Sequence, residues 1–231
     1  MYPYGFYWDR TLLILVPAII LSAYASYKVN SVTNRYFRVR STRGMSGEQV
    51  ARTILDRNGL GSVQIRPVGG TLTDHYDPRS RTVNLSEEVF YGTSVTSISV
   101  AAHECGHAIQ HKESYWPLTF RSAIVPAVNF ASSASWIIIL LGFFINRRWL
   151  WLGIVLFSAT VLFQIVTLPV EFNASRRALK QLQTLGITTD QEENYESRKV
   201  LGAAALTYVA AALSAILQLL RLVVIARDDN N

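Results

Sequence analysis

Four apolar segments stand out along the chain, and polar stretches separate them. They cover residues 11–27, 122–145, 149–172 and 201–220. A helix that crosses a bilayer needs about 20 mostly apolar residues, so this pattern predicts about four transmembrane helices. The alanine-rich fourth segment would also suit a buried soluble helix, but small residues let membrane helices pack closely. We therefore interpret all four segments as membrane spans.

The first segment is the shortest, which raises the alternative of a cleaved signal peptide. No positively charged side chain precedes it within residues 1–8. A signal peptide carries positive charge in this position. We therefore predict that residues 1–27 form an uncleaved N-terminal membrane anchor.

The larger polar stretch, residues 28–121, predicts a small region that mixes helices and strands. Ser46 and Gln49 have the spacing of a capping box, which predicts a short amphipathic helix over residues 47–58. The sequence SVQIRPV, at residues 62–68, alternates apolar and polar positions. This alternation predicts a half-buried strand.

The next stretch, TLTDHYDPRSRTVNLS, predicts a β-hairpin followed by a long helix. Asp77 and Pro78 begin the turn, because proline presets the backbone angle of the first corner position. A helix is expected from about residue 93 to residue 112. The third apolar segment is expected to continue past Pro169 as a helix that ends at Gly186.

These elements predict an α-helical multi-pass membrane protein with a small α+β domain. The predicted parts are, in chain order, the anchor at 1–27, a cytoplasmic α+β part at 28–121, a transmembrane hairpin at 122–172, a cytoplasmic helical segment at 173–200, and a C-terminal transmembrane helix with its tail at 201–231.

The net charge of +6 could indicate a nucleic-acid partner, but the basic residues follow the membrane segments instead. The two clusters behind the first and third segments are Lys28, Arg35, Arg38, Arg40 and Arg43, and Arg176, Arg177 and Lys180. Positive charge beside a span marks its cytoplasmic end. Arg147 and Arg148, between the second and third segments, oppose this orientation but are outnumbered. No RNP, zinc-knuckle or helix-turn-helix signature is present, so we expect no nucleic-acid partner.

The chain has one cysteine, Cys105, so it cannot form an intrachain disulfide. This composition fits a domain that faces the reducing cytoplasm. We therefore expect the protein in the plasma membrane, with both polar regions in the cytoplasm and both termini outside.

The sequence His103-Glu104-Cys105-Gly106-His107 matches the motif H-E-x-x-H. Residues four apart lie one above the other on a helix, so His103 and His107 can bind one Zn²⁺. Glu104 is rotated about 100° from His103 and can reach a water molecule instead of the metal. The alternative is a pair of histidines without a metal. It is disfavoured because the preceding SISVAA predicts a buried helix, where unpartnered polar groups are costly.

A zinc site that performs chemistry needs a third protein ligand. His111 lies only four residues after His107, and its spacing does not fit the metzincin pattern, so we interpret it as a polar residue near the helix end. Glu171 is the better choice, because a carboxylate at the edge of an apolar helix needs a partner. The alternative partner for Glu171 is a nearby cation, Arg176 or Lys180. Cys105 points away from the histidine face and is expected to serve in packing.

The chain resembles the YugP-type family of membrane zinc metallopeptidases. The matching segments are FYWD, LTDHYDPRSRTVNLSEEVFYG, AAHECGHAIQH and LPVEFNASRRALKQL, which extend over nearly the whole chain. It is more distantly similar to HtpX-like and CAAX-prenyl gluzincin proteases, in which a membrane hairpin separates H-E-x-x-H from a later glutamate. In those proteins an aspartate stands where this chain has Ser175. The resemblance implies a zincin-like (gluzincin) fold and protease activity with Zn²⁺ as the cofactor.

The expected reaction is hydrolysis of a peptide bond in a membrane or membrane-associated protein. Glu104 is the expected general base, with His103, His107 and Glu171 as the metal ligands. The predicted hairpin could present an edge strand to an extended polypeptide. His75, or Tyr76 beside it, could donate to the oxyanion, although both could equally well only support the turn.

A second interpretation is a membrane scaffold or chaperone adaptor that retains the fold without catalysis. The intact Glu104 favours the enzyme, because a scaffold has no need of a base. The expected partners are a polypeptide substrate and the lipid bilayer, with other membrane proteins or further copies of the chain as open alternatives.

Overall fold

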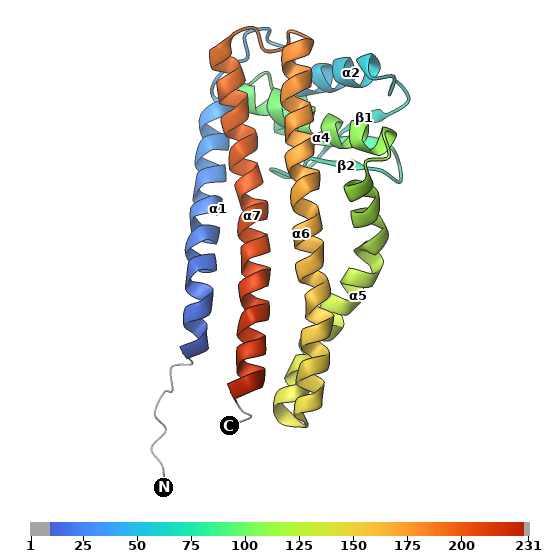
Figure 1. The fold of residues 1–231 in the computed structure, drawn as a ribbon. Coiled ribbons are helices and arrows are strands. Elements are labelled where there is room, and N and C mark those ends of the chain that lie inside the picture. Colours follow the sequence, from blue (N-terminus) through green and yellow to red (C-terminus); the bar gives the residue numbers. More distant parts are fainter. Residues whose placement is uncertain (1–9, 229–231) are drawn as a thin grey trace. The chain divides into compact units, whose positions relative to one another are not determined.

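The computed structural model describes residues 10–228, so part of the predicted anchor, residues 1–9, lies outside the described residues. Figure 1 shows a mostly helical protein with one small sheet. A 3-10 turn at Arg10–Leu15 precedes the helices α1 (Val16–Phe37), α2 (Gly47–Arg57), α3 (Glu87–Tyr91), α4 (Val95–Lys112), α5 (Trp116–Phe144), α6 (Arg147–Thr184) and α7 (Gln191–Asp228), and the strands are β1 (Gln64–Val68), β2 (His75–Asp77) and β3 (Thr82–Ser86).

The chain divides into two compact units. Within the described residues, the first unit comprises 10–24, 121–166 and 208–228. It contains parts of four helices that are long and apolar enough to cross a membrane, as the sequence predicts. Large side chains such as Ile19, Ile137 and Val155 are more than 60% exposed. Exposed apolar surface of this extent is unfavourable in water and indicates a membrane environment.

The second unit, Ala25–Phe120 and Thr167–Thr207, contains the sheet. The central strand β3 pairs with β1 in parallel and with β2 in antiparallel orientation. The predicted hairpin is therefore present, and β2 is an edge strand. Helices α2 and α4 pack together and against the sheet, and their shared core includes Val50, Ile54, Val83, Leu85, Ile98 and Ala102.

Local sequence signals explain where several elements begin. The side chain of Ser46 accepts from the backbone N–H of Gln49, whose own side chain accepts from the N–H of Ser46, so the predicted capping box is confirmed. The long helix α4 begins at Val95, where Ser94 caps it. The sequence prediction missed the short helix α3, because a five-residue EEVFY segment is too short to show helical periodicity.

Helices α6 and α7 are longer than their apolar segments. Helix α6 continues past Pro169 to Thr184, and Gly186 follows with a φ of +59°, so the predicted continuation and its end are confirmed. Helix α7 already begins at Gln191, where Asp190 Oδ1 accepts from the N–H of Glu193 at 2.7 Å.

Candidate metal centre

Helix α4 places the two motif histidines one turn apart on the same face. The ring centroids of His103 and His107 are 4.8 Å apart, and the rings are nearly perpendicular. The opposite side of the helix is fully buried, with Ala101, Ala102 and Cys105 in the core. Because that packing fixes the rotation of the helix, both imidazoles point toward the same space.

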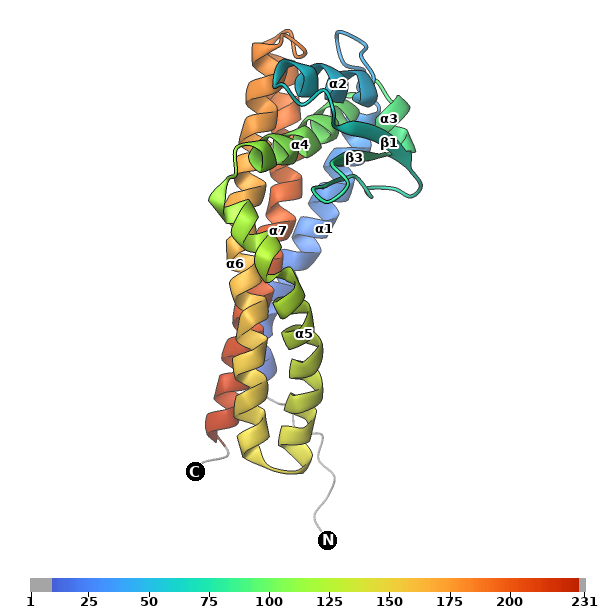
Figure 2. The same cartoon turned by 90° about the vertical axis from the view of Figure 1, so that its right-hand side faces the viewer.

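A close crossing of α4 and α6 brings the third side chain to the histidines. Figure 2 shows α4 lying across α6. The crossing is at Gly106, where an added Cβ would lie only 2.6 Å from the carbonyl oxygen of Ala174. A glycine is needed here because any larger residue would push the helices apart. Glu171 lies about one turn before Ala174 on α6 and therefore faces His103 and His107.

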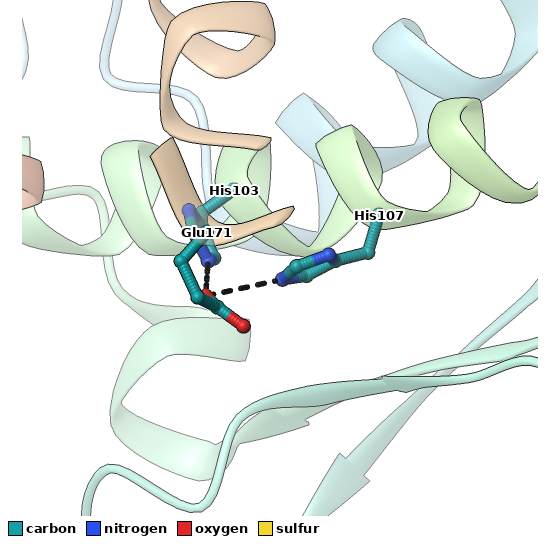
Figure 3. A group of neighbouring side chains, drawn as sticks. All are labelled: His103, His107 and Glu171. Atoms are coloured by element: carbon teal, nitrogen blue, oxygen red, sulfur yellow. Dashed lines mark hydrogen bonds and ion pairs between the residues drawn. The ribbon is translucent and has the colours of Figure 1, made fainter. Parts of the chain in front are cut away.

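The carboxylate of Glu171 contacts both imidazoles (Figure 3). Its Oε2 lies 3.3 Å from His103 Nε2 and 3.5 Å from His107 Nε2. One ligand atom from each of the three residues can be chosen so that all lie within 4.8 Å of one another. The ligands of a tetrahedral zinc lie roughly 3.3 Å apart, given metal–ligand distances of about 2.0–2.1 Å. The two contacts of Glu171 are close to this spacing, so the three side chains form a possible site for one zinc ion.

Gln110 determines which nitrogen of His107 faces Glu171. The NH₂ group of Gln110 donates to two acceptors, the carbonyl of Val170 at 2.8 Å and Asn173 Oδ1 at 3.0 Å. Its Oε1 is therefore the atom that lies 3.0 Å from His107 Nδ1. An amide oxygen only accepts, so Nδ1 carries the hydrogen and the lone pair of Nε2 points at Glu171.

With this tautomer, two acceptor atoms of His107 and Glu171 face each other, and no hydrogen lies between them. In neutral His107, the Nε2 lone pair faces the carboxylate oxygen of Glu171 at 3.5 Å. A positive charge is needed to hold such atoms together. Burial disfavours protonation, yet the contact with Glu171 and the charge of Glu104 outweigh it and raise the pKa of His107 above its ordinary value. The site therefore favours a cation or a proton at this point.

Ser175 contacts His103 as Gln110 contacts His107, at the ring nitrogen that faces away from Glu171. Its Oγ lies 3.2 Å from His103 Nδ1, one turn beyond Glu171 on α6. The resemblance stated from the sequence implies an aspartate at this position in the distantly similar proteases. The hydroxyl of Ser175 contacts the histidine, but a hydroxyl is a weaker acceptor than a carboxylate. Gln110 was missed, although its position three residues after His107 on the same helix could have indicated it.

This chemistry agrees with the relatives of the chain. Residues 11–227 match the family described as "Putative neutral zinc metallopeptidase". The chain belongs to this family. It is also 50% identical to the "Putative membrane protease YugP" of Bacillus subtilis (strain 168) over 223 residues, which cover 95% of this chain and 99% of that protein. No solved structure matches the chain. The family description implies zinc, and the three side chains described above form a possible site for it.

Two other residues of the motif are buried in different surroundings. Glu104 is 7% exposed and lies between the two histidines in the sequence. Cys105 is fully buried, and its Sγ lies 3.6 Å from the carbonyl of Ala51 on α2. Burial raises the pKa of this thiol far above its ordinary value. A thiol that stays protonated and faces the core suits the packing role expected from the sequence.

The remaining histidines lie on or beside the hairpin. His111 Nδ1 is 2.8 Å from the hydroxyl of Tyr76 on β2. The ring of His75 is held on both sides: Nδ1 donates to the carbonyl of Thr73 at 2.8 Å, and Nε2 accepts from Asn84 Nδ2 at 3.2 Å. Neither histidine belongs to the group of three side chains that could hold a metal ion among the described residues.

Proposed function

We propose that this protein is an integral membrane zinc endopeptidase that cleaves membrane or membrane-associated proteins at the cytoplasmic face. The observation that carries the proposal is the convergence of His103 Nε2, His107 Nε2 and Glu171 Oε2 on one point, with the far nitrogen of each histidine already engaged. Membership in a family described as zinc metallopeptidases supports zinc as the metal. The part at 28–121 would be a zincin-like domain.

In the proposed reaction, His103, His107 and Glu171 hold the metal and Glu104 moves the proton. A bound zinc ion activates water and polarises the scissile carbonyl. Glu104 follows His103 directly on α4, so its carboxylate is free of the ligand role and can take the proton from water. It then passes this proton to the leaving amine, which makes it the general acid as well.

The proposed docking element for the substrate is the edge strand β2. One side of this strand pairs with β3, and an extended polypeptide could pair with its other side through backbone hydrogen bonds. The face of α4 that carries the metal ligands continues to His111, whose Nδ1 contacts Tyr76 on β2. A chain on this edge would thus run beside the helix that holds the metal.

We propose His75 as the donor to the oxyanion, and this role requires its second ring nitrogen to act as a donor. Its Nδ1–H already donates to Thr73, so a second donor exists only if Nε2 is also protonated and turns away from Asn84. A hydrogen bond to charge that develops in the transition state would supply the stabilisation. The hydroxyl of Tyr76 would be the other donor, after leaving His111.

The proposal is tested with zinc content, thermal stability and cleavage measured on the same preparations. Glu104→Gln should keep about one zinc per chain and lose cleavage by about 10²–10⁴-fold, because only the base is removed. Glu88→Gln is the matched control, since Glu88 is exposed on α3. His103→Ala and His107→Ala should abolish zinc binding, and Glu171→Ala should weaken it strongly.

The outcomes separate the enzyme from the scaffold. If wild type binds zinc but cleaves none of a varied set of membrane and unfolded substrates, the scaffold or chaperone-adaptor interpretation replaces the enzyme. If Glu104→Gln cleaves as fast as wild type, Glu104 is not the base. Undiminished zinc in Glu171→Ala would make His111 the next ligand to test.

The cytoplasmic orientation has its own test. Single cysteines at Ser80, Thr189 and Asn146, in a Cys105→Ala background, place thiols at exposed positions. In intact cells, a membrane-impermeant reagent should label the thiol at position 146 and spare those at 80 and 189. The reverse pattern would place the metal ligands outside the cell.

A further inference from the structure

We propose that a cavity beside the α4–α6 crossing binds a phosphate group. This cavity has a volume of about 480 Å³ and lies within the second unit. Its walls come from the C-terminal end of α4, the following turn of α6 beyond the metal ligand, and the end of α2. It contains neither the metal ligands nor Glu104, so it is a site apart from the proposed peptidase centre.

The lining of the cavity is strongly basic. Arg176, Arg177 and Lys180 line it together with a single carboxylate, Glu113. Glu113 Oε2 is paired with Arg177 at 2.7 Å. In the described part of the chain, the side chains of Arg176 and Lys180 have no hydrogen bond or ion pair. Two positive charges therefore remain for a ligand, and an anion is the chemistry that they select.

Neutral amide donors complete the lining. Asn173 Oδ1 accepts from Gln110 at 3.0 Å and from Arg177 Nε at 2.6 Å, which directs its NH₂ group away from both. Gln181 Oε1 accepts from Asn58 at 3.1 Å, which likewise leaves its NH₂ group to donate. The cavity thus offers guanidinium, ammonium and amide donors from several directions. A phosphate group, with several oxygens in a tetrahedral arrangement, uses such donors better than a carboxylate with two.

Arg177 is already held in place before any ligand arrives. Besides its bonds to Asn173 and Glu113, its guanidinium lies 5.9 Å from the ring centroid of Tyr115. A side chain that is fixed in advance loses little conformational entropy on binding. Arg177 thus gives the cavity one donor group that is preset beside the two exposed cations, Arg176 and Lys180.

The phosphate can come from a lipid headgroup or from a free phosphate. In the sequence, Arg176 lies four residues beyond Phe172, at the end of the apolar part of α6. Basic pockets at this position beside membrane helices meet anionic headgroups. A soluble phosphate has the same recognition chemistry, so the experiment must separate the two sources.

The test uses the full-length protein in nanodiscs of phosphatidylcholine, with and without phosphatidylglycerol, and inorganic phosphate as the soluble probe. Lipid retention is counted by native mass spectrometry, and phosphate binding is measured by calorimetry. The Arg176→Gln/Lys180→Gln variant should bind phosphatidylglycerol or inorganic phosphate, whichever wild type binds, at least about tenfold more weakly, because two charged donors are lost. Both side chains are exposed, so the fold should tolerate the change, and thermal unfolding verifies this.

The matched control is Arg38→Gln/Arg79→Gln, which removes the same charge from exposed positions outside the cavity. Selective retention of phosphatidylglycerol that only the cavity variant loses establishes a headgroup site. Binding of inorganic phosphate that only the cavity variant loses, without a lipid preference, establishes a soluble ligand. Equal losses in both variants, or no binding of either probe by wild type, overturn the proposal. Zinc content serves as an independent readout for the proposed metal centre.

Discussion

Gln110 Oε1 lies 3.0 Å from His107 Nδ1, while the NH₂ group of the same side chain donates to α6. This fully buried glutamine therefore has two effects. It fixes the tautomer of His107, a proposed metal ligand, and it joins the helix of that histidine to the helix of Glu171.

We expect Gln110→Leu to weaken zinc binding by about 10–100-fold, the usual effect of losing a hydrogen-bond partner of a metal ligand. Zinc affinity is measured by competition with a chelator. Nitrogen NMR of the imidazoles, at a pH above the raised pKa of His107, should show this histidine losing its single tautomer in the zinc-free protein. Gln183→Leu, at an exposed position on α6, is the control and should leave both readouts unchanged. Unchanged affinity in Gln110→Leu would show that the helix packing alone orients His107.

Ser175 should have a smaller and tunable effect on the same site. Its Oγ is 3.2 Å from His103 Nδ1, and a hydroxyl is a weaker acceptor than a carboxylate. Ser175→Ala should therefore lower zinc affinity by about tenfold, and Ser175→Asp should restore or exceed that of wild type. The same chelator competition measures both variants. Equal affinities in all three proteins would mean that the contact does not support His103.

The glycine at the helix crossing should be indispensable for the geometry. Gly106→Ala places a Cβ 2.6 Å from the carbonyl oxygen of Ala174, so α4 and α6 must separate. We expect a loss of about 1–3 kcal/mol in the free energy of unfolding, as for overpacked cores, together with weaker zinc binding. Gly202→Ala on α7 is the control, because its Cβ meets no atom within 4 Å. It should be neutral or stabilising.

Two aspartates of the hairpin should give stability profiles of opposite sign. Burial raises the pKa of Asp74, although hydrogen bonds from Ser86 oppose this. A raised pKa contributes stability that is complete below about pH 4 and is lost as the pH rises through the folded-state value. Asp74→Asn should therefore be at least as stable as wild type at pH 7, and this advantage should disappear near pH 4. Chemical unfolding at several pH values measures it.

Asp77 provides the comparison within the same hairpin. Hydrogen bonds from Ser80 and from the N–H of Arg79 lower its pKa. This contribution to stability is present above about pH 4 and is lost as the pH falls through the lowered value. Asp77→Asn should be less stable than wild type at pH 7, and the difference should shrink in acid. If both variants respond to pH alike, the two carboxylates do not differ in their surroundings as described.

The elements that the sequence predicted correctly are those that depend on neighbouring residues. The bonds between Ser46 and Gln49 span three residues, and the turn that begins at Asp77 needs only the next few. The parallel pairing of β1 with β3 was not predicted, because it joins Ile65 to Val83 across 18 residues, with no turn signal of its own. The helix α3 was missed because it is too short to show a period.

The candidate site divides in the same way. The sequence by itself determined the arrangement of His103 and His107, because residues four apart lie on one face of any helix. It also supplied Glu171 as a carboxylate in need of a partner, but not the meeting of these groups. That meeting depends on the crossing at Gly106 and Ala174, which are 68 residues apart in the sequence. Only the tertiary structure decided this contact, the tautomer set by Gln110 and the basic cavity beside the crossing, because each results from how two distant helices pack.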